Sequence, residues 1–201
     1  MTWIRTIPYK EATGRLKQLY DRVKGPDDNV DNIMMAHSLR PHSMEGHMHI
    51  YKYVLHHSAN TLEKWFLEAL GVYTSSLNDC SYCVEHHYQG MRRLLGDDDR
   101  SGGIRLAIEA DAPDRAFDGR ELAAMRYARA LTRAPADLTS TDIAGLRACG
   151  LEDGEILEIN QVVAYFNYAN RTVLGLGVHT EGDIIGLSPG NSNNPDDWNH
   201  T

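Results

Sequence analysis

The feature that most constrains the fold is the stretch 153–177, which is long, strongly apolar and helical in its period. Ile159 and Val163 share one face of such a helix, whereas Leu157 and Tyr165 lie on others. A helix that is apolar nearly all round has to be buried, either inside a larger core or between subunits. A subunit interface explains this helix better than a lone bundle of 201 residues, so we expect a homo-oligomer.

Three asparagines, Asn160, Asn167 and Asn170, interrupt this apolar helix. Buried amides need hydrogen-bond partners. We therefore expect these side chains either to fix the packing register or to line a functional site.

The rest of the chain repeats the helical period, and strand signals are almost absent. We expect an all-α fold with a single helical-bundle domain over residues 1–181. Residues 182–201 are rich in Gly, Ser, Asn, Asp and Pro, which predicts an extended or disordered tail. The expected helices are 10–24, 30–38, one opened by Pro41, one capped by Asn60 with Glu63 three residues later, one from about 79 to 95, 103–110, 119–133, 140–149 and 153–177.

Charge and hydropathy exclude several classes of function. The net charge of −8 argues against a surface for nucleic acid or for an anionic membrane. No stretch approaches the roughly 20 apolar residues of a membrane span. The first ten residues, MTWIRTIPYK, lack the apolar core of a secretory signal. We therefore expect a cytoplasmic enzyme or binding protein.

A C-x-x-C sequence is the strongest chemical signal in the chain. If the segment from about residue 79 is helical, Cys80, Cys83 and His87 lie on one face, at i, i+3 and i+7. Asn78 and Asp79 are good N-cap residues, which puts Cys80 in the first helical turn, where the helix dipole favours a thiolate. This spacing predicts a redox-active dithiol that forms a reversible disulfide, with Cys80 as the thiol of lower pKa.

Two other interpretations of the cysteines are structural zinc and a chance pair of buried thiols. Zinc requires four ligands, and a set built from Cys80, Cys83, His86 and His87 on one helix has poor geometry. Cys149 stands alone near the end of a predicted helix, where we expect a small buried hydrophobic side chain. We therefore expect no metal.

The wider pattern resembles a known family. Glu68, eleven further residues, Cys80-x-x-Cys83 and, after three more, His87 are similar to the motif of the alkyl hydroperoxidase D family, within the carboxymuconolactone decarboxylase-like superfamily. The string NDCSYCVEHH resembles its peroxidase-related branch most. The C-terminal stretch EILEINQVVAYFNYANRTVLGLGV is also similar, so the resemblance spans most of the chain. Tyr82 departs from the best-known members, which have histidine between the cysteines.

The resemblance implies an antioxidant peroxidase, an alkyl hydroperoxide reductase-like oxidoreductase. It implies peroxide attack by Cys83, with Cys80 as the resolving cysteine and His87 and Glu68 as a proton relay. Tyr82 would replace the missing histidine in that relay. It also implies homotrimers or homohexamers, no haem, flavin or metal, and an external dithiol reductant, either a protein or a lipoyl-type dithiol.

Two rival functions remain open from the sequence. One is a thiol–disulfide redox sensor or oligomeric scaffold that reacts with oxidants without turnover. The other is the decarboxylase or lactonase chemistry of the superfamily's other branch, against which the cysteine pair argues, because those enzymes do not depend on a C-x-x-C.

Overall fold

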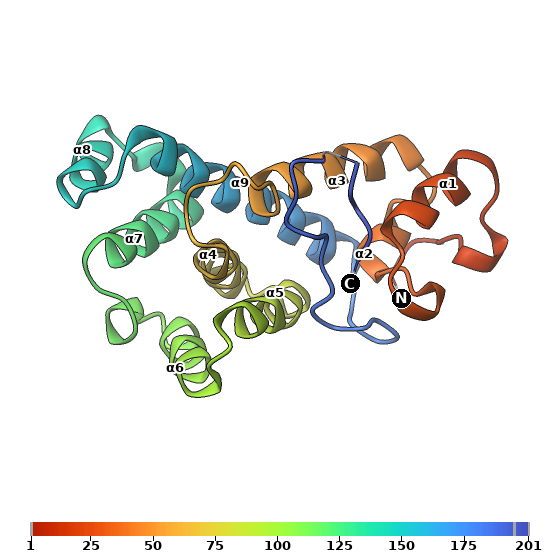
Figure 1. Ribbon diagram of the computed structural model, residues 1–201, viewed down its shortest axis with the longest axis horizontal. Coiled ribbons are helices and arrows are strands. Elements are labelled where there is room, and N and C mark those ends of the chain that lie inside the picture. Colours follow the sequence, from red (N-terminus) through yellow and green to blue (C-terminus); the bar gives the residue numbers. More distant parts are fainter. Residues whose placement is uncertain (1, 195, 201) are drawn as a thin grey trace. The chain divides into compact units, whose positions relative to one another are not determined.

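The backbone is all-α, as the sequence predicts. The computed structural model describes residues 2–194 and 196–200, which form nine α-helices, short 3₁₀ turns and only two isolated β-bridges (Figure 1). Its contacts divide the chain into two compact units, residues 61–170 and residues 1–60 with 171–201. Among the helices so described, none combines the length and the apolar composition needed to cross a membrane.

The unit 61–170 is built around one buried helix. Helix α4 contacts α5, α6 and α7, which surround it in Figure 1. Every residue of α4 from Phe66 to Ser75 is buried, and each Leu or Val side chain removed from water in this way stabilises the fold by about 1.5–3 kcal/mol. The helices of this unit are α4 (Lys64–Leu77), α5 (Ser81–Leu95), α6 (Asp98–Glu109), α7 (Gly119–Arg133), α8 (Ser140–Ala148) and, up to residue 170, α9 (Asp153–Leu176).

Helix boundaries that depend on neighbouring residues match the predictions. Helices α7 and α9 agree with the predicted helices to within a residue. Helix α8 begins at residue 140 as predicted, directly after a capping box formed by Thr139 and Asp142. In the same way, Gly96 ends α5 in the left-handed conformation that glycine adopts without strain.

The predicted start of α4 is wrong. Asn60 does not cap it, because the helix begins at Lys64. The backbone N–H groups of Thr61 and Leu62 instead donate to the carboxylate of Glu158 on α9, at 2.8 and 3.0 Å. A side chain almost a hundred residues away in the sequence therefore fixes the backbone that leads into α4. No local sequence pattern could have indicated this contact. Helix α6 likewise begins earlier than predicted.

The other unit joins the first helices to the C-terminal segment. It contains α1 (Gly14–Val23), α2 (Asn32–Ala36) and α3 (Pro41–Leu55). The start of α2 is fixed by Asp183, whose carboxylate accepts from the Asn32 backbone N–H at 3.0 Å. Trp198 is buried, with the Arg22 guanidinium 3.5 Å from its ring centre. Residues 182–194 and 196–200 contain no helix, and a domain boundary at 182 stays a prediction.

Candidate active site

The C-x-x-C begins at a tight connection between α4 and α5. Asn78 is the C-cap of α4, and Asp79 adopts a left-handed conformation with φ of 55°. The Cys80 backbone N–H donates to the Ser75 carbonyl at 2.9 Å, while the Cys80 carbonyl accepts from the N–H of Val84 at 3.0 Å. Cys80 is therefore the N-cap residue of α5 and not, as predicted, a residue of its first turn. The positive end of the helix dipole still acts on its sulfur.

The two thiols form a hydrogen-bonded pair that is closed to solvent. Cys80 is 0% and Cys83 3% exposed, and both are free cysteines. The Cys83 thiol donates to the Cys80 sulfur, and this contact lowers the pKa of Cys80 despite its burial. The same contact, together with burial, raises the pKa of Cys83 well above its ordinary range. Of the two thiols, Cys80 is therefore the one that ionises first.

A network of amides and a hydroxyl adjoins these thiols. Asn170 Nδ2 donates to Ser75 Oγ at 2.9 Å, and Asn78 Nδ2 donates to the side-chain oxygens of Asn170 and Asn167 at 2.9 and 3.0 Å. Asn170 also contacts both sulfurs and Ser75 contacts that of Cys83, and each contact lowers the pKa of the thiol it touches. Of the asparagines in the apolar helix, Asn170 thus lines the site. Asn160 instead donates a hydrogen bond from Nδ2 to the Tyr127 hydroxyl at 2.9 Å.

Glu68 and His87 form a second pair, in which the carboxylate is buried and the imidazole half-buried. His87 Nδ1 donates to Glu68 Oε2 at 2.7 Å, and the Glu68 side chain is only 3% exposed. Phe166 packs edge-on against the imidazole, with ring centres 4.5 Å apart. Gly71 on α4 makes room for that phenyl ring, since a Cβ at this position would approach Phe166 Cζ to 2.1 Å. The structure thus brings together two residues nineteen positions apart, which the sequence linked only through the motif.

Two tyrosines lie close to this site in different ways. Tyr82 is buried and its ring lies 4.5 Å from that of His86. Tyr165 on α9 is also buried, and burial together with the neighbouring Cys83 and Glu68 raises its pKa. Ser75 belongs to no motif that the sequence displays. The signals for Tyr165 are its position in the apolar helix and in the C-terminal stretch that resembles the family.

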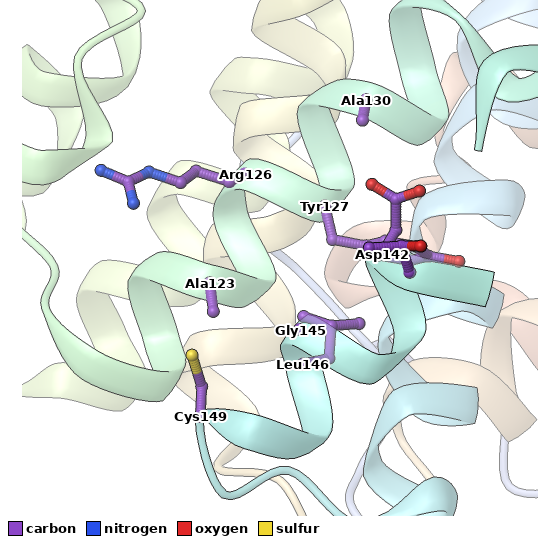
Figure 2. A pocket seen from close by; sticks show the side chains of 9 residues that line it. Ala123, Arg126, Tyr127, Ala130, Asp142, Gly145, Leu146 and Cys149 are labelled. Carbon is purple, nitrogen blue, oxygen red and sulfur yellow. The ribbon is translucent and has the colours of Figure 1, made fainter. Parts of the chain in front are cut away.

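Cys149 lies in a different environment, and the prediction that it is buried is wrong. Its side chain is exposed at the C-cap of α8, where it lines an open pocket of about 340 Å³ between α7 and α8 (Figure 2). Helix α8 buries only Leu146, so most of its surface faces solvent. In the described part of the chain, no three His, Cys, Asp or Glu side chains are arranged to hold a metal ion.

Similarity to known proteins is found in three dimensions. No family model and no curated protein matches the sequence. A peroxidase-related protein from Silicibacter sp. TM1040 superposes with a TM-score of 0.67 at 25% identity, over 75% of this chain and 76% of that one. A second, the alkylhydroperoxidase AhpD core protein from Ralstonia eutropha JMP134, gives 0.75 at 19% identity over 89% and 91%. The debrominase Bmp8 gives 0.67 at 16% identity over 89% and 90%. The chain thus has the alkylhydroperoxidase D-like fold that its cysteine motif predicts.

Proposed function

We propose that this chain is a hydroperoxide reductase that cycles Cys80 and Cys83 between a dithiol and a disulfide. The observation that carries the proposal is the buried, hydrogen-bonded pair of thiols at the N-terminus of α5, the helix that also carries His87, which is paired with Glu68. Peroxidase-related proteins of the same fold support it.

In the first step, the Cys80 thiolate attacks the terminal oxygen of the peroxide. The S–O bond forms as the O–O bond breaks, so Cys80 becomes a sulfenic acid and an alkoxide leaves, to be protonated to the alcohol. The family resemblance implies Cys83 as the attacking sulfur. We assign Cys80 instead, because Cys83 is the donor of the shared hydrogen bond and so keeps its proton in the resting pair.

In the second step, His87 activates the other sulfur. His87 lies one turn of α5 beyond Cys83, whose raised pKa makes a base necessary. The imidazole takes the Cys83 proton while Glu68, the acceptor of its Nδ1–H, stabilises the imidazolium. The Cys83 thiolate then displaces hydroxide from the Cys80 sulfenic acid. The disulfide forms, and the returned proton converts hydroxide to water.

A phenol assists this proton transfer. Tyr82 occupies the position of the family's histidine, but its ring stacks on His86. Tyr165 is the tyrosine close to both Cys83 and Glu68. We therefore assign the relay role to Tyr165 and a packing role to Tyr82. Two thiol–disulfide exchanges with an external dithiol restore the reduced pair.

Steady-state consumption of an organic hydroperoxide in the presence of dithiothreitol tests this function. We expect continuous turnover by the parent chain and by Cys149→Ser, and none by Cys80→Ser. Consumption of one equivalent per chain, followed by arrest, would identify a redox sensor and overturn the proposal. Because a debrominase of the same fold has been solved with 2,3,4-tribromopyrrole, a parallel assay offers a brominated pyrrole. Debromination without peroxide turnover would also contradict the proposed reaction.

We also propose that the enzyme is a homotrimer or homohexamer. Leu157 and Tyr168 of α9 are 60% and 42% exposed in a single chain. They are eleven residues apart, which is close to three full turns, so both project from one side of the helix. Packing of this side against another copy would remove both side chains from water. Light scattering at micromolar concentration should give three or six times 22.6 kDa, and a monomeric or dimeric mass would contradict the proposal.

A further inference from the structure

We infer that Asn170 and Ser75 donate hydrogen bonds to the two sulfurs and so stabilise the thiolate of the reduced dithiol. This inference rests on the proposed function, since it concerns the same two sulfurs. It assigns a role to two residues that lie outside the cysteine motif, one on α9 and the other on α4.

The orientation of the Asn170 amide follows from its partners. Asn170 is 0% exposed, and its Oδ1 accepts from Asn78 Nδ2 at 2.9 Å. The oxygen is therefore turned toward Asn78, and both amide protons point the other way. Nδ2 donates to Ser75 Oγ at 2.9 Å, which leaves its second proton for the sulfurs that Asn170 contacts.

Ser75 supplies a hydrogen-bond donor to the second sulfur, that of Cys83. Because its Oγ accepts from Asn170, its own hydroxyl proton is available as a donor, and Cys83 is the sulfur it contacts. The Ser75 carbonyl also holds the Cys80 N–H at 2.9 Å, which fixes the N-cap residue itself. Asn78 thus donates to Asn170 and Asn170 to Ser75, which form a chain of hydrogen bonds next to the dithiol.

These donors favour the reduced, charged state of the pair. Hydrogen bonds to an ionised acceptor are about twice as strong as neutral ones, and burial strengthens them further. When Cys80 and Cys83 become a disulfide, the charge disappears and the donors lose their anionic partner. Removal of the Asn170 amide should therefore lower the thiolate fraction and shift the equilibrium with dithiothreitol toward the disulfide.

Titration of the reduced thiols by their thiolate absorbance near 240 nm tests this inference in a Cys149→Ala background, where the pair supplies the only thiols and a Cys80→Ala, Cys83→Ala chain gives the tyrosinate baseline. In Asn170→Ala we expect the first thiol pKa to rise by about one unit or more, a tenfold loss of thiolate below that pKa. The matched control is Asn160→Ala on the same helix, whose amide serves Tyr127, and its titration should not change.

An unchanged titration in folded Asn170→Ala, with circular dichroism like that of the parent, would overturn the inference. If that variant does not fold, Ser75→Ala decides, because it removes one hydroxyl and should raise the pKa of Cys83 further. No shift in folded Ser75→Ala would then contradict the inference. The titration uses no peroxide, so a chain without peroxidase activity can still give a positive result, and an active peroxidase can give a negative one.

Discussion

Cys80 and Cys149 both lie at helix ends, but at opposite ones. Cys80 is the N-cap residue of α5, at the positive end of the helix dipole, and Cys149 is the C-cap residue of α8, at the negative end. Cys80 is buried beside a second thiol and an amide, whereas Cys149 is exposed in an open pocket. Cys80 and Cys149 therefore differ in helix end and in neighbouring donors as well as in exposure, and the proposed redox role of Cys80 depends on the first two.

The largest effect should come from replacing the cysteines one at a time. Cys83→Ser should abolish turnover yet leave a single sulfenic acid on Cys80 that a dimedone-type reagent traps. Cys149→Ser should keep its rate within about twofold of the parent. A trappable sulfenate in Cys80→Ser, with none in Cys83→Ser, would show that Cys83 attacks first and would reverse the assigned order.

The second largest effect should come from replacing His87, the proposed base. His87→Ala should slow disulfide formation by roughly 10²–10⁴-fold near neutral pH, the range typical of general-base catalysis, so the Cys80 sulfenate should accumulate. The pKa of Cys83 is raised, so this thiol ionises unaided only in alkaline solution, and the variant should recover rate as the pH rises.

Rapid mixing followed by intact-mass measurement distinguishes the sulfenate from the disulfide. Glu68→Gln should also slow disulfide formation, but by a smaller factor than His87→Ala. A His87→Ala chain that closes its disulfide as fast as the parent at pH 7 would remove His87 from the mechanism.

Two glycine substitutions compare the packing around the dithiol site with that of the α8 region, where Cys149 lies. Gly71→Ala should destabilise the fold by about 1–3 kcal/mol, because its Cβ would overlap Phe166, which packs on His87. Gly145→Ala on α8 meets no atom within 4 Å and should stabilise its helix by about 0.5–1 kcal/mol. Urea denaturation measures both, and no loss of stability in Gly71→Ala would contradict the packing described for Phe166.

The smallest effect is expected at the capping box of α8. Thr139→Ala removes the side chain that accepts from the Thr141 N–H and should cost about 1 kcal/mol of stability. Because this helix carries Cys149 and not the dithiol, the peroxidase rate should not change. A rate loss greater than about twofold, measured well below the unfolding transition, would indicate an unexpected connection between the regions.

The sequence predicted those parts of the molecule that local chemistry determines. The period of α9 and the Thr139 cap are encoded by neighbouring residues, and Glu68 and His87 came from a spaced motif. The start of α4 could not be predicted, since Glu158 organises it from another helix. The same limit applies to Ser75, because its contact with Asn170 exists only after the helices pack.

The most direct test of the account is peptide mapping by mass spectrometry after the reduced chain reacts with one equivalent of an organic hydroperoxide. The account predicts that the peptide containing Cys80 and Cys83 loses two hydrogens, that dithiothreitol restores them, and that Cys149 stays a free thiol throughout. Two free thiols at Cys80 and Cys83 under excess peroxide, or oxidation confined to Cys149, would contradict it.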